Sequence, residues 1–355
     1  MNKNILVSFQ KDDSLNTIID ELKAKGHSVI FFRKKLDLNL EKSAGLALCV
    51  PLLPFIFLLN IARLIYLKQK YKINSLVCLD WHDKIILSPI ANLLKIKTTW
   101  IELPHMDLKK AKKILLPFYK INSKKSRIIT FSDLAKQQLI KLGVEEDKIR
   151  LIMPAAKLDR RKQNHAQSGL TQNEAQFNKK FFVVGTFSDL NKDQNIETLF
   201  QAVKICTEII PNIQLIIVGE GEERKNLGWL AKKMGIDSLV WMVGEQGQTR
   251  KWLDNFDVFV VSKKFFRLPD LEIILKGMAA GLPVIGPADS GLEDIVENNR
   301  NGYLVDAGNS ELFARQIMKL GQDERLRLKL GQIAKEKAEE LFTLEKQIKS
   351  IEEII

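Results

Sequence analysis

The sequence has few cysteines and no visible export signal. Its 355 residues include three cysteines, Cys49, Cys78 and Cys206, which lie far apart in the chain. Three scattered cysteines make neither a zinc-binding set nor a disulfide framework. No signal-peptide pattern opens the sequence, so we expect a cytoplasmic protein. With 45% hydrophobic and 28% charged residues, the composition excludes a disordered or collagen-like chain.

Acidic residues are scarce in the first half of the chain. Residues 1–178 carry 31 Lys and Arg against 16 Asp and Glu, a net charge of +15, whereas the remainder has a net charge of −3. A positive excess confined to one half indicates contact with an anionic partner, such as nucleic acid, lipid headgroups or a phosphorylated substrate. A lysine-rich surface explains part of the total charge but not its asymmetry.

Short apolar runs alternate with amphipathic helical stretches along the whole chain. This alternation predicts an α/β protein with two doubly wound domains, each a parallel sheet covered by helices on both faces. The expected strands are 4–9, 28–32, 76–79, 98–101, 128–131, 181–184, 215–218, 240–243, 258–261 and 283–286, and the expected helices include 14–25, 196–209 and 222–234.

The two domains are separated by a polar stretch without periodicity at 159–180, which is rich in Gln and Asn. Such a composition is typical of a linker. We therefore predict an N-terminal domain at 1–160, a linker at 161–180 and a C-terminal domain at 181–340. A final helix at 341–355 is expected to pack back on the first domain.

A charge-free segment of 20 residues, 43–62, is long enough to span a bilayer. A single span would separate strands of one sheet, and Pro51 and Pro54 would break the helix. Three interpretations stay open: a buried helix, insertion into a membrane surface, and a transmembrane span, of which the last fits the topology least.

The segment Lys109–Arg127 has eight basic residues and no acidic one, interleaved with apolar and aromatic side chains. This pattern is typical of an interfacial anchor on anionic lipid, with a solvated lysine face over core residues as the alternative. We expect no nucleic-acid partner, because no recognition helix or aromatic strand pair accompanies the charge.

Two strand ends in the second half carry glycines before a helix. The strand at 181–184 runs into Gly185, and Lys192 precedes the next helix; the strand at 215–218 runs into Gly219 and Gly221. Glycine lets backbone N–H groups approach a phosphate, and lysine adds a point charge. The alternative for each glycine is a tight turn.

Taken in order, segments of the second half resemble a known family. VGTFSDLNKDQNIETLFQAV, LIIVGEGEERKNL, WLDNFDVFVV, GMAAGLPVIG and SGLEDIV look like the C-terminal domain of family 4 (group 1) glycosyltransferases. The resemblance is strongest over 181–320 and softer in the first half. It implies a GT-B fold, in which two Rossmann-like domains face across a cleft, and a nucleotide-sugar donor used with retention of anomeric configuration.

The resemblance implies a role for each matching residue. Lys192 takes the place of the lysine that pairs with the donor diphosphate, and Glu293 that of a glutamate near the donor pocket. His105 is the counterpart of a histidine that touches the donor sugar, or else a loop histidine without a role. His82 could contact the acceptor, with no role as the alternative. Main-chain contacts to the donor are implied at Gly185, Gly219, Gly221, Val243 and Gly244.

The sequence also departs from the family pattern. Leu268 and Lys276 stand where the family has a pair of glutamates that hold donor-sugar and ribose hydroxyls, and Thr186 replaces an arginine beside the phosphate lysine. Asp270 and Glu272 could receive sugar hydroxyls instead, and Lys276 could face phosphate. The alternative is that Asp270 caps the helix that starts here and Glu272 complements its dipole.

The resemblance implies a glycosyltransferase that needs neither metal nor other cofactor, with His105, Asp270 and Glu272 as candidate catalytic residues. The acceptor would be a glycan or lipid-linked molecule of the bacterial cell envelope, and the enzyme would be cytoplasmic, peripheral on the inner face of the plasma membrane. A GT-B protein that has lost catalysis and acts as the partner of an active transferase is the alternative, followed by sugar-phosphate chemistry such as epimerisation.

Overall fold

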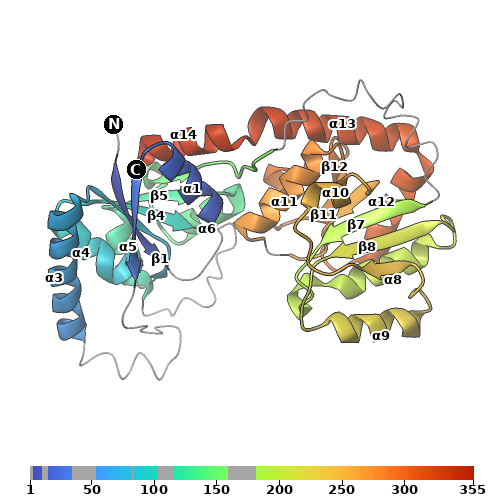
Figure 1. The fold of residues 1–355 in the computed structure, drawn as a ribbon, viewed down its shortest axis with the longest axis horizontal. Helices are drawn as coiled ribbons and strands as arrows, with labels where there is room; N and C mark the ends of the chain where they lie inside the picture. Colours follow the sequence, from blue (N-terminus) through green and yellow to red (C-terminus); the bar gives the residue numbers. More distant parts are fainter. Residues whose placement is uncertain are drawn as a thin grey trace. The chain divides into compact units, whose positions relative to one another are not determined.

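The computed structural model describes residues 3–9, 15–33, 53–81, 83–102, 115–158, 181–264 and 266–355. The chain divides into two compact units, each with its own sheet (Figure 1). Unit 1 consists of Met1–Pro154, Arg267–Pro269 and Leu344–Ile355, and unit 2 of Ala155–Phe266 and Asp270–Thr343. The predicted linker at 161–180 lies outside the described residues, and the predicted domain limits stay predictions.

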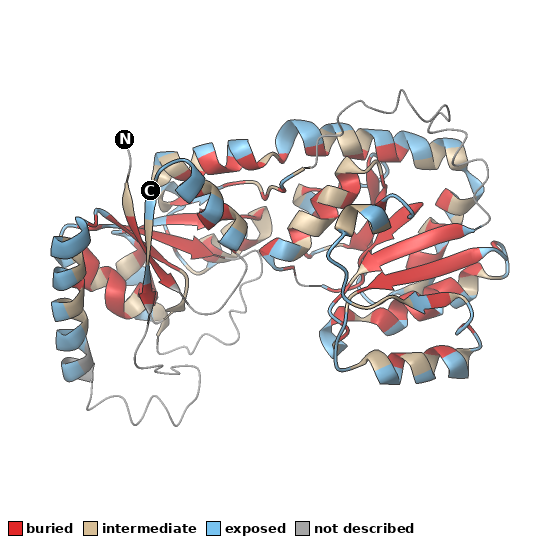
Figure 2. Cartoon of the chain, in the orientation of Figure 1, coloured by how far each residue is buried: buried red, intermediate tan, exposed pale blue. Residues whose placement is uncertain are grey.

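Unit 1 contains a six-stranded parallel sheet in the order β2-β1-β3-β4-β5-β6. Most side chains of its inner strands are buried on both faces, as a parallel sheet between helices requires (Figure 2). In the register, Ile5 pairs with Val29 on one side and with Ser75 on the other. The strands are β1 (Asn4–Phe9), β2 (Ser28–Arg33), β3 (Ser75–Cys78), β4 (Lys97–Glu102), β5 (Arg127–Thr130) and β6 (Ile149–Leu151).

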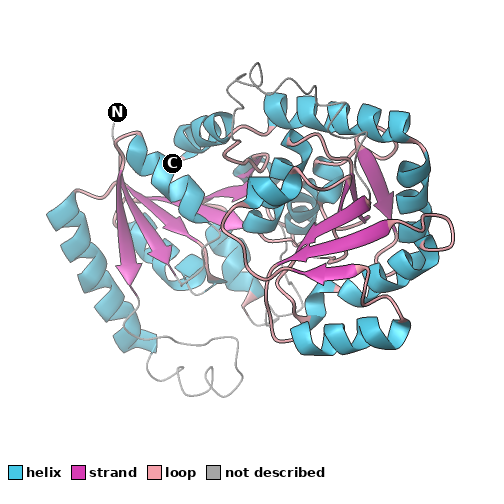
Figure 3. Ribbon diagram, turned by 45° about the vertical axis from the view of Figure 1, so that its right-hand side comes forward, coloured by secondary structure: helices cyan, strands magenta, loops and turns pink. Residues whose placement is uncertain are grey.

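Helices flank the sheet of each unit (Figure 3). The first helix turns an apolar stripe inward, formed by Ile18, Ile19 and Leu22. The helices of unit 1 are α1 (Asn16–Ala24), α3 (Leu53–Tyr71), α4 (Ser88–Leu93), α5 (Leu116–Ser123), α6 (Asp133–Lys141) and α14 (Leu344–Ile354), with a π-helical turn η2 (Asp83–Leu87) and a 3-10 turn η3 (Glu146–Lys148).

Helix α14 packs on α1 in unit 1, although its sequence follows that of unit 2. Ile348 and Ile351 join the buried cluster that contains the apolar face of α1. On the polar side, the Glu352 carboxylate lies 2.9 Å from Lys25 Nζ and 2.9 Å from His27 Nε2. The hydrogen bond from Lys25, followed by that from His27, lowers the pKa of Glu352. Unit 1 therefore includes the last segment of the chain.

Unit 2 contains a second six-stranded parallel sheet, in the order β12-β11-β10-β7-β8-β9. Its strands are β7 (Phe182–Phe187), β8 (Ile213–Val218), β9 (Val240–Met242), β10 (Val258–Val260), β11 (Val284–Pro287) and β12 (Gly302–Val305). Its helices are α8 (Ile196–Cys206), α9 (Arg224–Met234), α10 (Thr249–Leu253), α11 (Leu268–Ala279), α12 (Ser310–Gln322) and α13 (Glu324–Leu341), with 3-10 turns η4 (Lys192–Gln194) and η5 (Leu292–Asp294).

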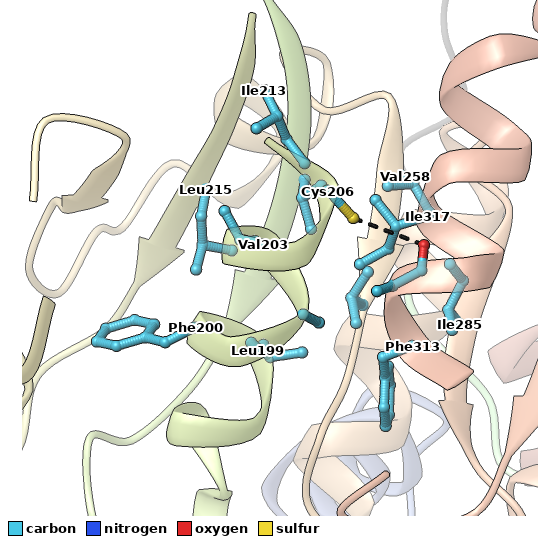
Figure 4. Packing of buried hydrophobic residues seen from close by; sticks show 14 of the residues in the cluster. Leu199, Phe200, Val203, Cys206, Ile213, Leu215, Val258, Ile285, Phe313 and Ile317 are labelled. Carbon is cyan, nitrogen blue, oxygen red and sulfur yellow. Dashed lines mark hydrogen bonds between the residues drawn. The ribbon is translucent and has the colours of Figure 1, made fainter. Parts of the chain in front are cut away.

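The core of unit 2 lies between its sheet and the paired helices α8 and α12 (Figure 4). Val203 of α8 and Ile317 of α12 are fully buried, and the Cys206 thiol points from α8 to the carbonyl oxygen of Ala314 on α12, 3.5 Å away. Burial raises the pKa of Cys206 to about 12. This thiol is a packing group held in the neutral form.

The two doubly wound sheets confirm the predicted fold class. Each expected strand is present, with ends that differ by up to three residues. The edge strands β6 and β12 were not expected from the pattern. β6 has only three residues, of which Arg150 and Leu151 are exposed, and β12 begins at Gly302. A strand of three residues with two exposed side chains, such as β6, gives only a weak hydrophobic signal.

The burial of Cys206 predicts a test of the unit 2 core. At pH 8 the thiolate fraction of a thiol with a pKa near 12 is roughly 10³-fold lower than that of an ordinary cysteine, and the thiolate is the nucleophile. We expect iodoacetamide to leave the Cys206 peptide unmodified in the native protein and to modify it in guanidinium, as measured by mass spectrometry. Comparable rates in both conditions would contradict this packing.

Candidate functional site

The topology of the unit 2 sheet places its crevice beside β7. The chain passes from β7 to β8 and β9 on one side, and then to β10, β11 and β12 on the other. In doubly wound sheets a ligand lies beyond the carboxyl ends of the strands where the order reverses. The loops that follow β7 and β10 are therefore the first place to look for a site.

The loops after β7, β8 and β9 are joined by backbone hydrogen bonds. Ser188 N donates to Val218 O at 2.9 Å, and Leu190 N donates to Glu220 O at 2.9 Å. Gly219 N donates in turn to the carbonyl oxygen of the loop after β9, at Gly244, over 2.9 Å. Three strand ends thus form one continuous backbone surface at the carboxyl edge of the sheet.

The glycines of this edge have a packing reason. A Cβ at Gly219, where φ is +142°, would collide with the carbonyl oxygen of Ser188, and one at Gly221 would collide with the carbonyl of Leu190. A Cβ at Gly185 would collide with the Phe256 ring. The structure therefore supplies the tight-approach reason for all three glycines, and their contact with a donor stays a prediction.

Lys192 begins the 3-10 turn η4, which leads into α8. Its side chain is exposed, and it has no hydrogen-bond or ion-pair partner in the described part of the chain. The turn itself is fixed: Ser262 Oγ, after β10, donates to Gln194 O at 2.6 Å, and Ser188 Oγ donates to Gln194 Oε1 at 3.3 Å. A rigid turn at the strand-order reversal thus presents an unpaired cation.

Three further residues were predicted at the donor site: Val243 and Gly244, which follow β9, and Thr186, which lies within β7. Val243 N donates to Ile217 O at 3.0 Å, and Val243 O accepts from Gln246 Nε2 at 3.0 Å. Gly244 has a φ of +79°, which favours glycine. The Thr186 side chain is 2% exposed within β7. Their roles toward a nucleotide stay predictions.

Helix α11 carries the positions that depart from the family pattern. Asp270 lies inside its first turn, and its carboxylate is 2.5 Å from Lys263 Nζ; this residue pairs with a lysine after β10 instead of preceding the helix as a cap. Glu272 and Lys276 form an ion pair of 2.9 Å one turn apart. Leu268 is buried in a hydrophobic cluster of unit 1 and belongs to that unit. Charges in this helix are therefore already paired.

Glu293 holds together the loop that follows β11. Its carboxylate oxygens accept the backbone N–H groups of Asp289, Ser290 and Gly291, the last at 2.8 Å. A carboxylate that accepts several N–H groups fixes a turn much as a helix cap does. Contact between Glu293 and a donor stays a prediction, as does any role of His105 and His82, which lie outside the described residues.

Unit 1 has a buried polar row that the sequence analysis missed. At the carboxyl ends of β1 and β3, where its strand order reverses, Ser8 donates a hydrogen bond to Asp83. Beside them, Lys84 Nζ lies 2.7 Å from Glu102 Oε1 at the end of β4, and Tyr119 donates to the same oxygen at 2.6 Å. The side chains of Lys84 and Glu102 are 2% and 4% exposed.

The surroundings of this row explain its electrostatics. Burial, followed by the negative charge of Glu102, raises the pKa of Tyr119 well above its usual value. The Tyr119 ring packs between Trp81 and Trp100, at centroid distances of 4.6 and 4.8 Å. Asp83 and Lys84 begin the π-helical turn η2, a conformation that is frequent at functional sites. The sequence signal that could have indicated this row was the charged pair Asp83 and Lys84, which stands next to His82 in an otherwise mostly apolar stretch.

Within 3–9, 15–33, 53–81, 83–102, 115–158, 181–264 and 266–355, no three His, Cys, Asp or Glu side chains are placed to hold one ion. The described helices also include none that is long and apolar enough to cross a membrane.

The class of protein follows from comparison of this fold with solved structures. The chain superposes over 99% of its length on 98% of the HepE protein of Anabaena, solved in complex with UDP, with a TM-score of 0.76 and 16% identity. It also superposes, again over 99% of its length, on 97% of a glycosyltransferase of Rickettsia africae, with a TM-score of 0.78 and 15% identity. Two parallel six-stranded Rossmann-like sheets of this kind define the GT-B fold.

The sequence of unit 2 is similar to a family of glycosyltransferases. Residues 170–337, just under half of the chain, match the family model described as glycosyl transferases group 1. The lipopolysaccharide core biosynthesis glycosyltransferase LpsE of Rhizobium meliloti is 35% identical over 39% of either chain. The glycosyltransferase EpsD of Bacillus subtilis is 29% identical over 55% of this chain and 48% of its own. The chain spans less than half the length of these relatives.

The buried Lys84–Glu102 pair predicts a large effect on stability. Glu102→Gln keeps an acceptor for Tyr119 but leaves the Lys84 ammonium without its counter-charge, so we expect the free energy of unfolding to fall by about 3–5 kcal/mol in urea titrations.

Its control is Glu146→Gln, which breaks a bridge of 2.7 Å whose carboxylate side chain is 65% exposed. That change is expected to lower the free energy of unfolding by no more than about 1 kcal/mol. Adding Lys84→Met to Glu102→Gln should recover part of the loss, because the unpaired charge is then gone. Equal small losses at both sites would refute the buried pair.

Proposed function

We propose that the chain is a glycosyltransferase that moves a sugar, with retention of configuration, from a nucleotide-diphosphate sugar to a glycan or lipid-linked acceptor of the bacterial cell envelope. The observation that carries this proposal is Lys192, an unpaired cation on a fixed turn at the carboxyl edge of the unit 2 sheet. The family match over 170–337 supports the reaction class.

The donor side is assigned to unit 2. Lys192 and the N-terminus of α8 face the same edge and together supply a positive environment for a diphosphate. The curated relatives include enzymes named for lipopolysaccharide core and capsular polysaccharide synthesis, and HepE is solved with UDP and with UDP-glucose. These names support a nucleotide-sugar donor and an envelope acceptor.

In the proposed reaction, the acceptor hydroxyl attacks the anomeric carbon from the face that the nucleotide diphosphate leaves. A phosphate oxygen of the leaving group accepts the hydroxyl proton, so the sugar–phosphate bond breaks as the new glycosidic bond forms. Lys192 and backbone N–H groups neutralise the leaving diphosphate, which is why we propose that no metal is needed. His105 is proposed to contact the donor sugar.

The carboxylates Asp270 and Glu272 are proposed to receive sugar hydroxyls in place of the missing glutamate pair. Both already contact a lysine, at Lys263 and Lys276 respectively. Donor binding would therefore have to compete with these ion pairs. This competition favours the second candidate, a non-catalytic GT-B partner of an active transferase.

On the acceptor side, the basic first half of the chain is proposed to meet a lipid-linked or anionic acceptor at the inner face of the plasma membrane. The segment Lys109–Arg127 supports this proposal with its eight basic residues. In the described part of that segment, Phe118 and Ile121 of α5 are exposed while Tyr119 is buried.

Lys192→Ala tests the donor site. Removing a charge-assisted contact is expected to weaken binding of the cognate nucleoside diphosphate about tenfold or more, measured by calorimetry against UDP, GDP and ADP. The unfolding temperature should not change, because the exposed Lys192 side chain makes no hydrogen bond or ion pair with the described residues.

Lys204→Ala is the matched control, since Lys204 is another exposed lysine of this unit, in the last turn of α8. It is expected to bind as the unaltered protein does. If no nucleotide binds to the well-folded protein, the chain is instead a non-catalytic GT-B partner of an active transferase, and the proposal of an enzyme is wrong.

A further inference from the structure

Helix α3 exposes apolar side chains to solvent along most of its length. Its inner side packs on unit 1 through Leu64, which is fully buried, with Ile61 and Leu67 partly buried beside it. Its outer side carries large hydrophobic side chains that are 37–64% exposed: Phe55, Phe57, Leu58, Leu59, Ile65 and Tyr66. Figure 2 shows the exposed outer face of this helix.

This pattern is unusual for the surface of a globular protein. The outward face of a surface helix is normally polar, and a helix that is apolar all round is normally buried or in lipid. Phe55, Leu58, Leu59, Ala62, Ile65 and Tyr66 recur at intervals of three and four residues and so form one stripe. A contiguous apolar stripe of this kind marks an interaction site.

The charges around the stripe are of one sign. Residues 42–79 contain no Asp or Glu and five Lys or Arg. Arg63 lies over the Phe32 ring at 4.2 Å, and Lys70 Nζ donates to the Tyr66 hydroxyl at 3.1 Å. Arg63 is thus turned toward β2, and Lys68 donates to the carbonyl oxygen of Leu94 at 2.6 Å. Lys70 and the Tyr66 ring lie beside the apolar stripe, and a cation next to aromatic and apolar side chains suits the boundary between headgroups and acyl chains.

We propose that α3 is the docking surface of this protein for an anionic lipid bilayer. The helix lies in the plane of the interface, with Phe55, Leu58 and Leu59 in the acyl boundary and Lys70 at the headgroups. This inference goes beyond the proposed function and does not depend on it, because it assigns a specific face and holds whether or not the chain transfers a sugar.

A second copy of the chain fits this surface less well. A symmetric dimer uses the same patch on both subunits, so the cations of one α3 would meet those of the other. An anionic bilayer instead offers a large apolar phase with opposite charge above it. Each basic residue near such a surface adds to the attraction, which salt weakens.

Vesicle flotation of the full chain tests the assignment. We expect binding to phosphatidylcholine vesicles that contain phosphatidylglycerol to be about tenfold or more stronger than to phosphatidylcholine alone, and weaker at high salt. Phe55→Ser with Leu58→Ser should lower the binding about tenfold or more. The control pair Ile209→Ser with Trp229→Ser, on unit 2, removes apolar side chains that are 48% and 66% exposed and should leave binding unchanged.

A second measurement locates the contact directly. An environment-sensitive dye on Leu58→Cys should shift its emission to the blue when anionic vesicles are added, whereas the same dye on Ile209→Cys should not. No vesicle binding, equal binding of both serine pairs, or a dimer that the Phe55 and Leu58 changes dissociate would overturn the proposal. Nucleotide calorimetry on the same variants reports on the donor site alone. It therefore distinguishes a failure of the lipid-docking proposal from a failure of the proposed donor site.

Discussion

The carboxyl edge of unit 2 depends on the close approach of three loop backbones. Ser188, Leu190 and Gly219 each donate a main-chain hydrogen bond to the neighbouring loop, and this is possible because Gly219 and Gly221 have no side chain. The turn that presents Lys192 is built on this backbone surface. The position of Lys192, which we propose binds the nucleotide sugar, is thus set by contacts within the protein itself.

Unit 1 uses a different means to organise the same edge of its sheet. Lys84, Glu102 and Tyr119 satisfy one another in the interior, where each alone would be costly to bury. The row runs across the ends of β1, β3 and β4. Two six-stranded parallel sheets therefore hold the carboxyl edges of their strands differently, one by backbone contacts and one by buried charge.

The fold was largely predictable because it depends on periodicity. Strands buried on both faces give apolar runs such as 215–218, and their alternation with amphipathic helices leaves few other arrangements. The segment 43–62 shows the limit of this approach. Its apolar character is plain, but whether a side chain such as Leu58 faces the core or solvent depends on what packs beside the helix.

The site was less predictable, because pairing between distant residues decides it. The Glu272–Lys276 pair follows from a spacing of four on a helix and could have been predicted. The Lys263–Asp270 pair could not, because it requires the chain after β10 to turn back on α11. Asp83 and Lys84 carried no motif of their own and stood next to His82, on which the sequence argument concentrated.

The return of α14 to unit 1 has a consequence for how the chain folds. Ile348 and Ile351 close the cluster that holds the apolar face of α1, yet all of unit 2 separates them from it in sequence. During synthesis, unit 2 can fold while the first unit still waits for its last helix, which reverses the usual N-terminal-first order. The uncovered face of α1 is then the surface that needs protection from aggregation.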